Sequence, residues 1–178
     1  MNGLFSPMLA AMRKRAVAPL LQGRVLDFGC GIGRLCDLVA PDAFVGVDAD
    51  SKVLAVAHRE HPRHVFQNLD RLPQLGGFDT IVAMAVIGYV DDLPNLLSNL
   101  SAKLNPSGKI IMTSPVPEAV LLHKFGARLG LFGSDVYETV SRLPRRSGIE
   151  AAAKGAGLRV TSFGRFMFGL NQLAVIAR

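Results

Sequence analysis

The stretch from Val25 to Gly33 constrains the fold of this chain more than any other. It reads Val-Leu-Asp-Phe-Gly-Cys-Gly-Ile-Gly, so an apolar run is followed at once by glycines at alternate positions. Glycine lets the backbone turn sharply and approach a ligand closely, and a helix that begins there presents free amide groups to an anionic group. The pattern predicts a strand, then a loop that binds a nucleotide-type cofactor, and then a helix from Gly33 to Val39.

The rest of the chain alternates short apolar runs with amphipathic segments of helical length, which is typical of a parallel sheet covered by helices on both faces. We expect strands at 24–28, 43–48, 64–67, 78–84, 109–114, 158–166 and 170–177, and helices at 7–21, 33–39, 51–60, 93–104 and 149–155. The last two strands are too close together for a parallel crossover, so they pair as an antiparallel hairpin. The predicted fold class is α/β, with a seven-stranded mixed sheet that is mostly parallel, an antiparallel C-terminal edge hairpin, and helices on both faces.

Three local patterns refine this expectation. Ser147 and Glu150 form a candidate capping box for the helix at 149–155. The Asn-Pro-Ser-Gly sequence at 105–108 predicts a turn before the fifth strand. Residues 115–146 do not follow the alternation and are too long for an ordinary connection, so they are expected to form an inserted lid or substrate segment. The 178 residues suit one domain, 1–178, with an N-terminal helical segment at 1–23.

The net charge of +6 lies entirely in the last third of the chain. Residues 1–120 contain 11 Lys and Arg against 11 Asp and Glu, whereas residues 121–178 contain 9 against 3. The excess therefore falls on the predicted lid and hairpin, and it is expected to face an anionic or amphipathic acceptor, or to make a peripheral contact with an anionic membrane surface. Charge reversal at Arg145 and Arg146 is expected to change the binding of the acceptor or the association with the membrane surface.

Other features of the sequence favour a cytoplasmic protein. Two cysteines are too few for a disulfide framework, and no signal-peptide pattern opens the sequence. The longest apolar runs are shorter than the roughly 20 residues that a membrane-spanning helix needs.

The motif at 25–33 also indicates the kind of cofactor. Arg34 occupies the position where a dinucleotide fingerprint has its third glycine, and no Gly-Lys-Ser/Thr follows as in a phosphate-binding loop. Asp27, two residues before the first glycine, would repel a pyrophosphate and suits a cofactor with a cationic end. Asp48 ends the second predicted strand, where a carboxylate accepts hydrogen bonds from ribose hydroxyls. A ribose together with a cationic amino-acid end indicates S-adenosylmethionine.

These motifs together resemble class I S-adenosylmethionine-dependent methyltransferases of the small-molecule type. The resemblance runs in order through residues 20–178. The matching segments are Leu-Asp-Phe-Gly-Cys-Gly at 26–31, Phe-Val-Gly-Val-Asp at 44–48, Phe-Asp-Thr-Ile-Val at 78–82 and Leu-Asn-Pro-Ser-Gly at 104–108. The resemblance implies a Rossmann-like fold and an enzyme that transfers a methyl group by an SN2 step.

The resemblance also implies roles for individual residues. Asp27 would orient the methionine amino group, and Asp48 would bind the ribose. At the adenine edge Asn68 stands where the family usually has an aspartate, with Leu69 offering its amide, and Asp70 is the competing assignment. The expected cofactor-binding residues are Asp27, Gly29, Cys30, Gly31, Gly33, Asp48, Ala49, Asn68, Leu69, Asp70, Ala83 and Met84.

No catalytic base is assigned, and Tyr89 and His123 are the candidates. Methyl transfer depends mainly on in-line placement of the two reactants, so a base is optional. His58, His61 and His64 have a spacing like that of metal ligands, but a proline between them interrupts any common helical face. No metal is therefore expected.

Three functions remain as hypotheses. The first is methylation of a small-molecule, lipid-linked or glycan-type acceptor. The second is a nucleic-acid (RNA) methyltransferase, against which the sequence Met-Ala-Val-Ile-Gly-Tyr at 84–89 argues, because enzymes that methylate base amino groups usually carry Asn/Asp-Pro-Pro-Tyr there. The third is a non-catalytic binding module of the same fold, against which the intact glycines and both carboxylates argue.

Overall fold

The computed structural model describes residues 6–119 and 143–178. Over these residues the chain forms a seven-stranded sheet in the order β3-β2-β1-β4-β5-β7-β6. The strands are β1 (Val25–Phe28), β2 (Phe44–Asp48), β3 (Val65–Asn68), β4 (Phe78–Met84), β5 (Leu104–Pro115), β6 (Arg159–Phe166) and β7 (Asn171–Ala177). Strands β1 to β5 are parallel, and β7 is antiparallel to both β5 and β6. The predicted fold class is confirmed.

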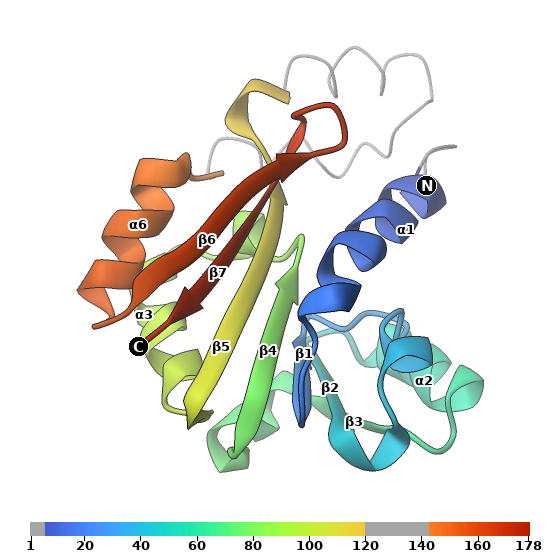
Figure 1. Cartoon of the computed structure of the whole chain (residues 1–178). Helices are drawn as coiled ribbons and strands as arrows, with labels where there is room; N and C mark the ends of the chain where they lie inside the picture. Colours follow the sequence, from blue (N-terminus) through green and yellow to red (C-terminus); the bar gives the residue numbers. More distant parts are fainter. Residues whose placement is uncertain (1–5, 120–142) are drawn as a thin grey trace.

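Helices cover both faces of the sheet (Figure 1). α1 (Ser6–Val17) and α2 (Ser51–Glu60) pack on one face through a core that includes Val17, Leu54 and Ala57. α3 (Leu93–Ser101) and α6 (Arg146–Gly155) pack on the other face through a second core. Because both faces of the central strands are buried, their sequences are almost continuously apolar.

The helix expected at 33–39 does not form. Gly31 and Gly33 both have positive φ, +53° and +81°, which takes the backbone out of the right-handed helical region. Only two 3-10 turns, η2 (Cys36–Leu38) and η3 (Pro41–Ala43), follow before β2. The connection from β1 to β2 is therefore a compact loop, and it offers the cofactor no long helix at its start.

Two further local expectations are wrong. α6 begins at Arg146 without a side-chain cap, because Glu150 accepts a hydrogen bond from Arg146 Nε at 2.8 Å and Ser147 lies inside the helix. An (i, i+4) pair of opposite charges has replaced the capping box. Residues 105–108 belong to β5 itself, since Phe78 pairs with Leu104 and Thr80 with Lys109. The extra residues bulge out of the ladder instead of forming a separate turn.

Most of the expected lid, 115–146, lies outside the described residues. Its first residues continue β5 to Pro115 and then form a 3-10 turn, η6 (Pro117–Ala119). Within the described ranges, no helix is both long enough and apolar enough to cross a membrane.

Candidate functional site

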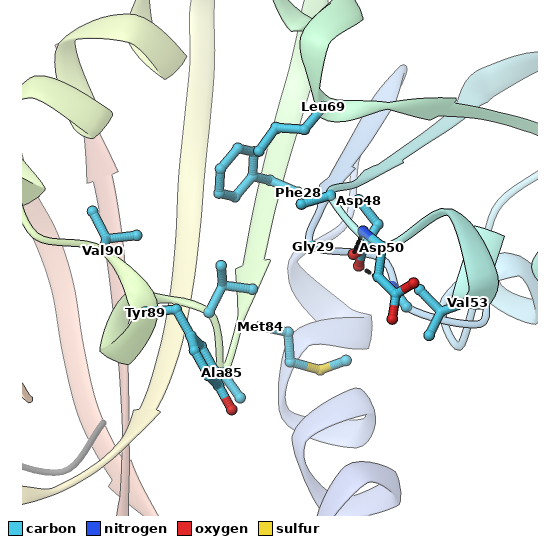
Figure 2. A pocket seen from close by; sticks show the side chains of 13 residues that line it. Phe28, Gly29, Asp48, Asp50, Val53, Leu69, Met84, Ala85, Tyr89 and Val90 are labelled. Carbon is cyan, nitrogen blue, oxygen red and sulfur yellow. Dashed lines mark hydrogen bonds between the residues drawn. The ribbon is translucent and has the colours of Figure 1, made fainter. Parts of the chain in front are cut away.

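A cavity of about 650 Å³ opens at the carboxyl ends of β1, β2 and β4, the edge where open α/β sheets bind their ligands. Figure 2 shows Asp48, Asp50 and Val53 on one side of this cavity and Met84, Ala85 and Tyr89 on the other. Seven residues singled out from the sequence line it: Gly29, Gly31, Asp48, Ala49, Leu69, Met84 and Tyr89. Six others line it without having been predicted: Phe28, Asp50, Val53, Ala85, Val86 and Val90.

Asp48 fixes the shape of the glycine loop. Its Oδ2 accepts a hydrogen bond from the Gly31 amide at 2.8 Å, and its Oδ1 accepts one from the Asp50 amide at 3.0 Å. Each carboxylate oxygen has a second lone pair for a ligand hydroxyl. Gly29 has φ +75°, and a Cβ there would stand 2.4 Å from Val86 Cγ2. Only glycine fits at this position.

Asp27 provides a test of whether the site fits S-adenosylmethionine. Its side chain is 1% exposed, and its Oδ1 has no hydrogen-bond partner. Burial, with a smaller contribution from the negative charge of Asp48, raises the pKa of Asp27 to about 7. A buried acceptor without a partner is costly, and a cationic donor from a ligand would relieve that cost. The two carboxylate acceptors, Asp27 and Asp48, therefore fit a cofactor with an ammonium group beside its ribose.

Asp27 is not among the residues that line the cavity, and three other expected cofactor residues also lie behind its wall. Cys30 is buried, and burial raises the pKa of its thiol well above the ordinary value, so it carries no charge at neutral pH. Ala83 belongs to the core on the α3 face. Gly33 faces away from the cavity, since a Cβ there would lie 2.9 Å from His61 Cδ2.

The two competing adenine ligands, Asn68 and Asp70, also lie outside the cavity. They line a separate hollow on the other side of the segment that follows β3. Asn68 Oδ1 accepts a hydrogen bond from the Asp70 amide at 3.2 Å and so caps the 3-10 helix η4 (Leu69–Gln74). Of this group the structure brings only Leu69 to the cavity.

The wall opposite Asp48 is formed by the segment after β4. Ala85 has φ +61°, a strained conformation for a residue with a Cβ, and its amide donates to Thr113 O at 2.9 Å. The Tyr89 side chain lines the cavity and is 66% exposed. His123 lies outside the described residues.

Sequence reasoning missed the contribution of α2. Asp50 caps this helix by accepting from the Lys52 amide at 2.8 Å, and Val53 lies in its first turn. The Asp50-Ser51 pair before an amphipathic segment is a helix start signal, and it would have placed both residues beside Asp48.

Residues 6–162 match the family model described as "Methyltransferase domain". The chain belongs to this family. The resemblance inferred from the motifs is thereby confirmed, and with it S-adenosylmethionine as the cofactor that this family and fold bind.

Curated relatives of the chain match about half of its residues. A ubiquinone biosynthesis O-methyltransferase of Rhodopseudomonas palustris is 27% identical over 99 residues, which are 51% of this chain and 39% of the relative. A trans-aconitate 2-methyltransferase of Variovorax paradoxus is 35% identical over 99 residues, 52% of this chain and 38% of the relative. A tRNA U34 carboxymethyltransferase of Pseudoalteromonas translucida is 30% identical over 112 residues, 57% of this chain and 35% of the relative.

The match to the first of these relatives thus spans 39% of that protein's length. Among solved structures, an S-adenosylmethionine-dependent methyltransferase from Mesorhizobium loti has the same fold. Its TM-score is 0.70 at 17% sequence identity, over 92% of this chain and 96% of that one.

Proposed function

We propose that this methyltransferase transfers the methyl group of S-adenosylmethionine to a small-molecule acceptor that carries an acidic group. The observation that carries the proposal is the cavity at the ends of β1, β2 and β4, with Asp48 on one wall and apolar side chains opposite. About 650 Å³ is the size of a pocket for one ligand or two small ones. With the cofactor in place, little room remains, so the acceptor is small or enters only with its reacting end.

The residues that would hold the cofactor are of two kinds, carboxylates and apolar side chains. Asp27 would accept hydrogen bonds from the ammonium group, and Asp48 from the ribose hydroxyls. The Leu69 segment would pack along the adenine, and Val53 lies in the same wall as Asp48. When bound, the cofactor supplies an electrophilic methyl group on a positively charged sulfur.

The acceptor would approach from the side of Met84, Ala85 and Tyr89. These residues place an apolar wall, with one exposed phenol, next to the cofactor site. Such a wall excludes water and holds the acceptor in line with the methyl group, and this positioning supplies much of the rate acceleration of the transfer. Tyr89 O–H would orient the acceptor as a hydrogen-bond partner.

Arg13 supports the proposal that the acceptor is acidic. It lies on α1, where its Nε donates to Asn171 Oδ1 at 3.0 Å, and burial lowers the pKa of its guanidinium. No carboxylate in the described part of the chain forms an ion pair with it. Among residues 6–119 and 143–178 its guanidinium donates to this neutral amide alone, so a partly desolvated cation has donors left for an anion.

Polar side chains lie on the α1 face of the sheet between Met84 and Arg13. Thr113 pairs with Met84 and lies on this face, as does Asn171, two ladder positions beyond Leu173. Thr113 Oγ1 is buried without a hydrogen-bond partner. A carboxylate that reached from Met84 toward Arg13 would satisfy both groups.

The basic residues singled out from the sequence are less suited to this role. Arg145 forms an ion pair with Glu118, and Arg146 forms one with Glu150 at 2.8 Å, all of them exposed. Their charges are already balanced locally. A contact of this end of the molecule with an anionic surface stays a prediction.

The test is a methylation assay with labelled S-adenosylmethionine and matched acceptors. The panel contains small aliphatic and phenolic acids, the corresponding amides, and unmodified tRNA. Methylation of an acid but not of its amide supports the proposal. Methylation of tRNA alone would assign the second hypothesis, the RNA methyltransferase, and cofactor binding without turnover on any member of the panel would contradict the proposal in favour of a binding module.

Two variants sharpen the assay. Arg13→Met is expected to raise the acceptor KM at least about tenfold, as expected for loss of a charge-assisted hydrogen bond. Arg15→Met, on the exposed side of the same helix, is the matched control and is expected to leave KM unchanged. Equal KM values for the two variants would exclude Arg13 as the anchor.

A further inference from the structure

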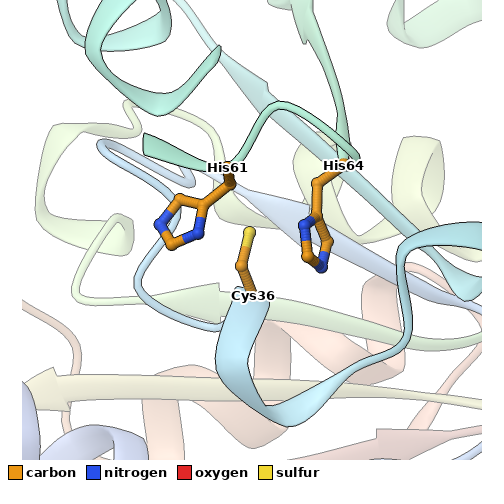
Figure 3. Close-up of side chains that lie close together, drawn as sticks. All are labelled: Cys36, His61 and His64. Atoms are coloured by element: carbon orange, nitrogen blue, oxygen red, sulfur yellow. The ribbon is translucent and has the colours of Figure 1, made fainter. Parts of the chain in front are cut away.

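Cys36, His61 and His64 lie together on the α2 side of the sheet, and none of them lines the cofactor cavity. Figure 3 shows the sulfur of Cys36 between the two imidazole rings. One ligand atom from each residue, the sulfur and two ring nitrogens, lies within 4.8 Å of the other two. Cys36 comes from η2, His61 ends α2, and His64 precedes β3. Two segments, η2 and the turn between α2 and β3, thus bring the three side chains together.

The donor set has the chemistry of a zinc ligand group. One thiolate and two imidazoles are borderline-soft ligands that Zn²⁺ prefers, and three protein ligands leave its fourth position open. With Zn–S and Zn–N bonds of about 2.3 Å and 2.1 Å, tetrahedral ligand atoms stand roughly 3.5 Å apart. The three atoms would have to move about 1 Å closer, which small side-chain rotations can provide.

The orientation of His64 matches that of a metal ligand. Its Nε2 lies 3.1 Å from the carbonyl oxygen of Val39, which can only accept a hydrogen bond. Nε2 therefore carries the proton, and Nδ1 keeps its lone pair. Histidines that bind metals usually donate their other ring N–H to a carbonyl in this way, because the bond fixes the tautomer and the ring.

The loop is also shaped to admit these side chains. A Cβ at Gly33 would lie 2.9 Å from His61 Cδ2 and 3.1 Å from Cys36 Sγ, so a larger residue would push the two ligands away. Asp37 follows Cys36 directly and forms an ion pair with Lys14 at 2.6 Å. Its negative charge is therefore balanced by Lys14 and adds no net charge beside the cluster.

We propose that Cys36, His61 and His64 form a binding site for Zn²⁺, with solvent in the fourth position. Binding releases the thiol proton to solvent and forms one Zn–S and two Zn–N bonds. Since Gly33 packs against two of the ligands, the ion would brace the glycine loop from behind. The role is structural, and it does not depend on the identity of the acceptor. The sequence argument against a metal concerned His58, His61 and His64, but the structure replaces His58 with Cys36, 25 positions before His61.

The test is a titration of the metal-free full chain, without a histidine tag, with Co²⁺ as a spectroscopic substitute for Zn²⁺. A tetrahedral site with a thiolate gives an intense charge-transfer band and visible ligand-field bands, and Zn²⁺ displaces both. We expect these bands at one equivalent of Co²⁺, and the competition with Zn²⁺ then gives the zinc affinity.

Three variants make the result specific. Cys36→Ser is expected to abolish the charge-transfer band. His64→Gln removes a ligand itself and is expected to weaken Zn²⁺ binding more than about 100-fold, since loss of a residue that only supports a ligand already costs up to roughly 100-fold. His58→Gln is the matched control. The His58 ring lies 5.4 Å from the Phe66 ring and outside the cluster, so this variant should bind Zn²⁺ like the unaltered chain. Circular dichroism reports whether each variant folds. Absence of the bands in the folded unaltered chain, or bands that persist in Cys36→Ser, would overturn the proposal.

Discussion

The buried carboxylate of Asp27 gives the sharpest prediction, because it links cofactor binding to pH. Its pKa is raised to about 7 from an ordinary value of 3.8, first by burial and then by Asp48. The ionised form is therefore disfavoured in the folded chain by about 4 kcal/mol. For an acid with a raised pKa, the unfavourable contribution to the stability of the folded chain grows as pH rises from about 4 to 7 and is complete above pH 7. Asp27→Asn is thus expected to stabilise the ligand-free chain at pH 8, by up to that amount.

Whereas the stability of the ligand-free chain falls as Asp27 ionises, its affinity for the cofactor should rise. Only the ionised carboxylate attracts an ammonium group, and it makes up about 10% of Asp27 at pH 6 and about 75% at pH 7.5. Ionisation of the carboxylate alone would raise the affinity roughly eightfold over this interval. An α-amino group with a pKa of about 7.7 is still about 60% protonated at pH 7.5, so the net rise is expected to be roughly fivefold.

Isothermal titration calorimetry with S-adenosylhomocysteine, at constant ionic strength from about pH 6 to pH 7.5, measures this slope. Asp27→Asn is expected to bind more weakly by about 1.5–3 kcal/mol at pH 7.5, the contribution of a hydrogen bond to a charged group, and to lose the slope. Asp48→Asn is the control and should weaken binding while keeping a rise with pH. A flat profile for the unaltered chain, or an equal slope in Asp27→Asn, would refute the reasoning.

Three further substitutions test other parts of the structure. Gly29→Ala puts a Cβ 2.4 Å from Val86 Cγ2 at φ +75°, so urea denaturation should show a loss of about 1–3 kcal/mol, with weaker cofactor binding. Ile110→Ala empties a fully buried site in the sheet and is expected to cost about 2–5 kcal/mol in the same assay, leaving cofactor affinity at saturation unchanged. Arg13→Met should raise the acceptor KM without changing the Kd of S-adenosylhomocysteine, and equal effects in Arg15→Met would contradict this.

Much of the sheet could be predicted from the sequence, because strands buried on both faces leave a plain apolar signal. β2 and β4 match their expected ranges to within one residue at each end, and the short spacing of β6 and β7 required the antiparallel hairpin. The positions of Asp48 and the glycines beside the cavity followed from the same pattern, since residues that end parallel strands meet at one edge.

The remaining differences arise where tertiary contacts compete with local preference. Gly31 and Gly33 adopt left-handed conformations that end any helix at 33–39, and spacing alone does not reveal the sign of φ. Leu69 enters the cavity while its neighbours Asn68 and Asp70 turn away, because Asn68 caps η4. Cys36 meets His61 and His64 only through the packing of η2 against α2, which no short motif encodes.

The hydrogen bond between Arg13 and Asn171 joins residues 158 positions apart in the chain. During synthesis α1 emerges early, but its partner belongs to the last strand, and that strand inserts between β5 and β6. A nascent chain can form β1 to β4 and the glycine loop with α1 still undocked. The contact between Arg13 and Asn171, next to the proposed acceptor side of the cavity, can therefore form only after β7 has been synthesised.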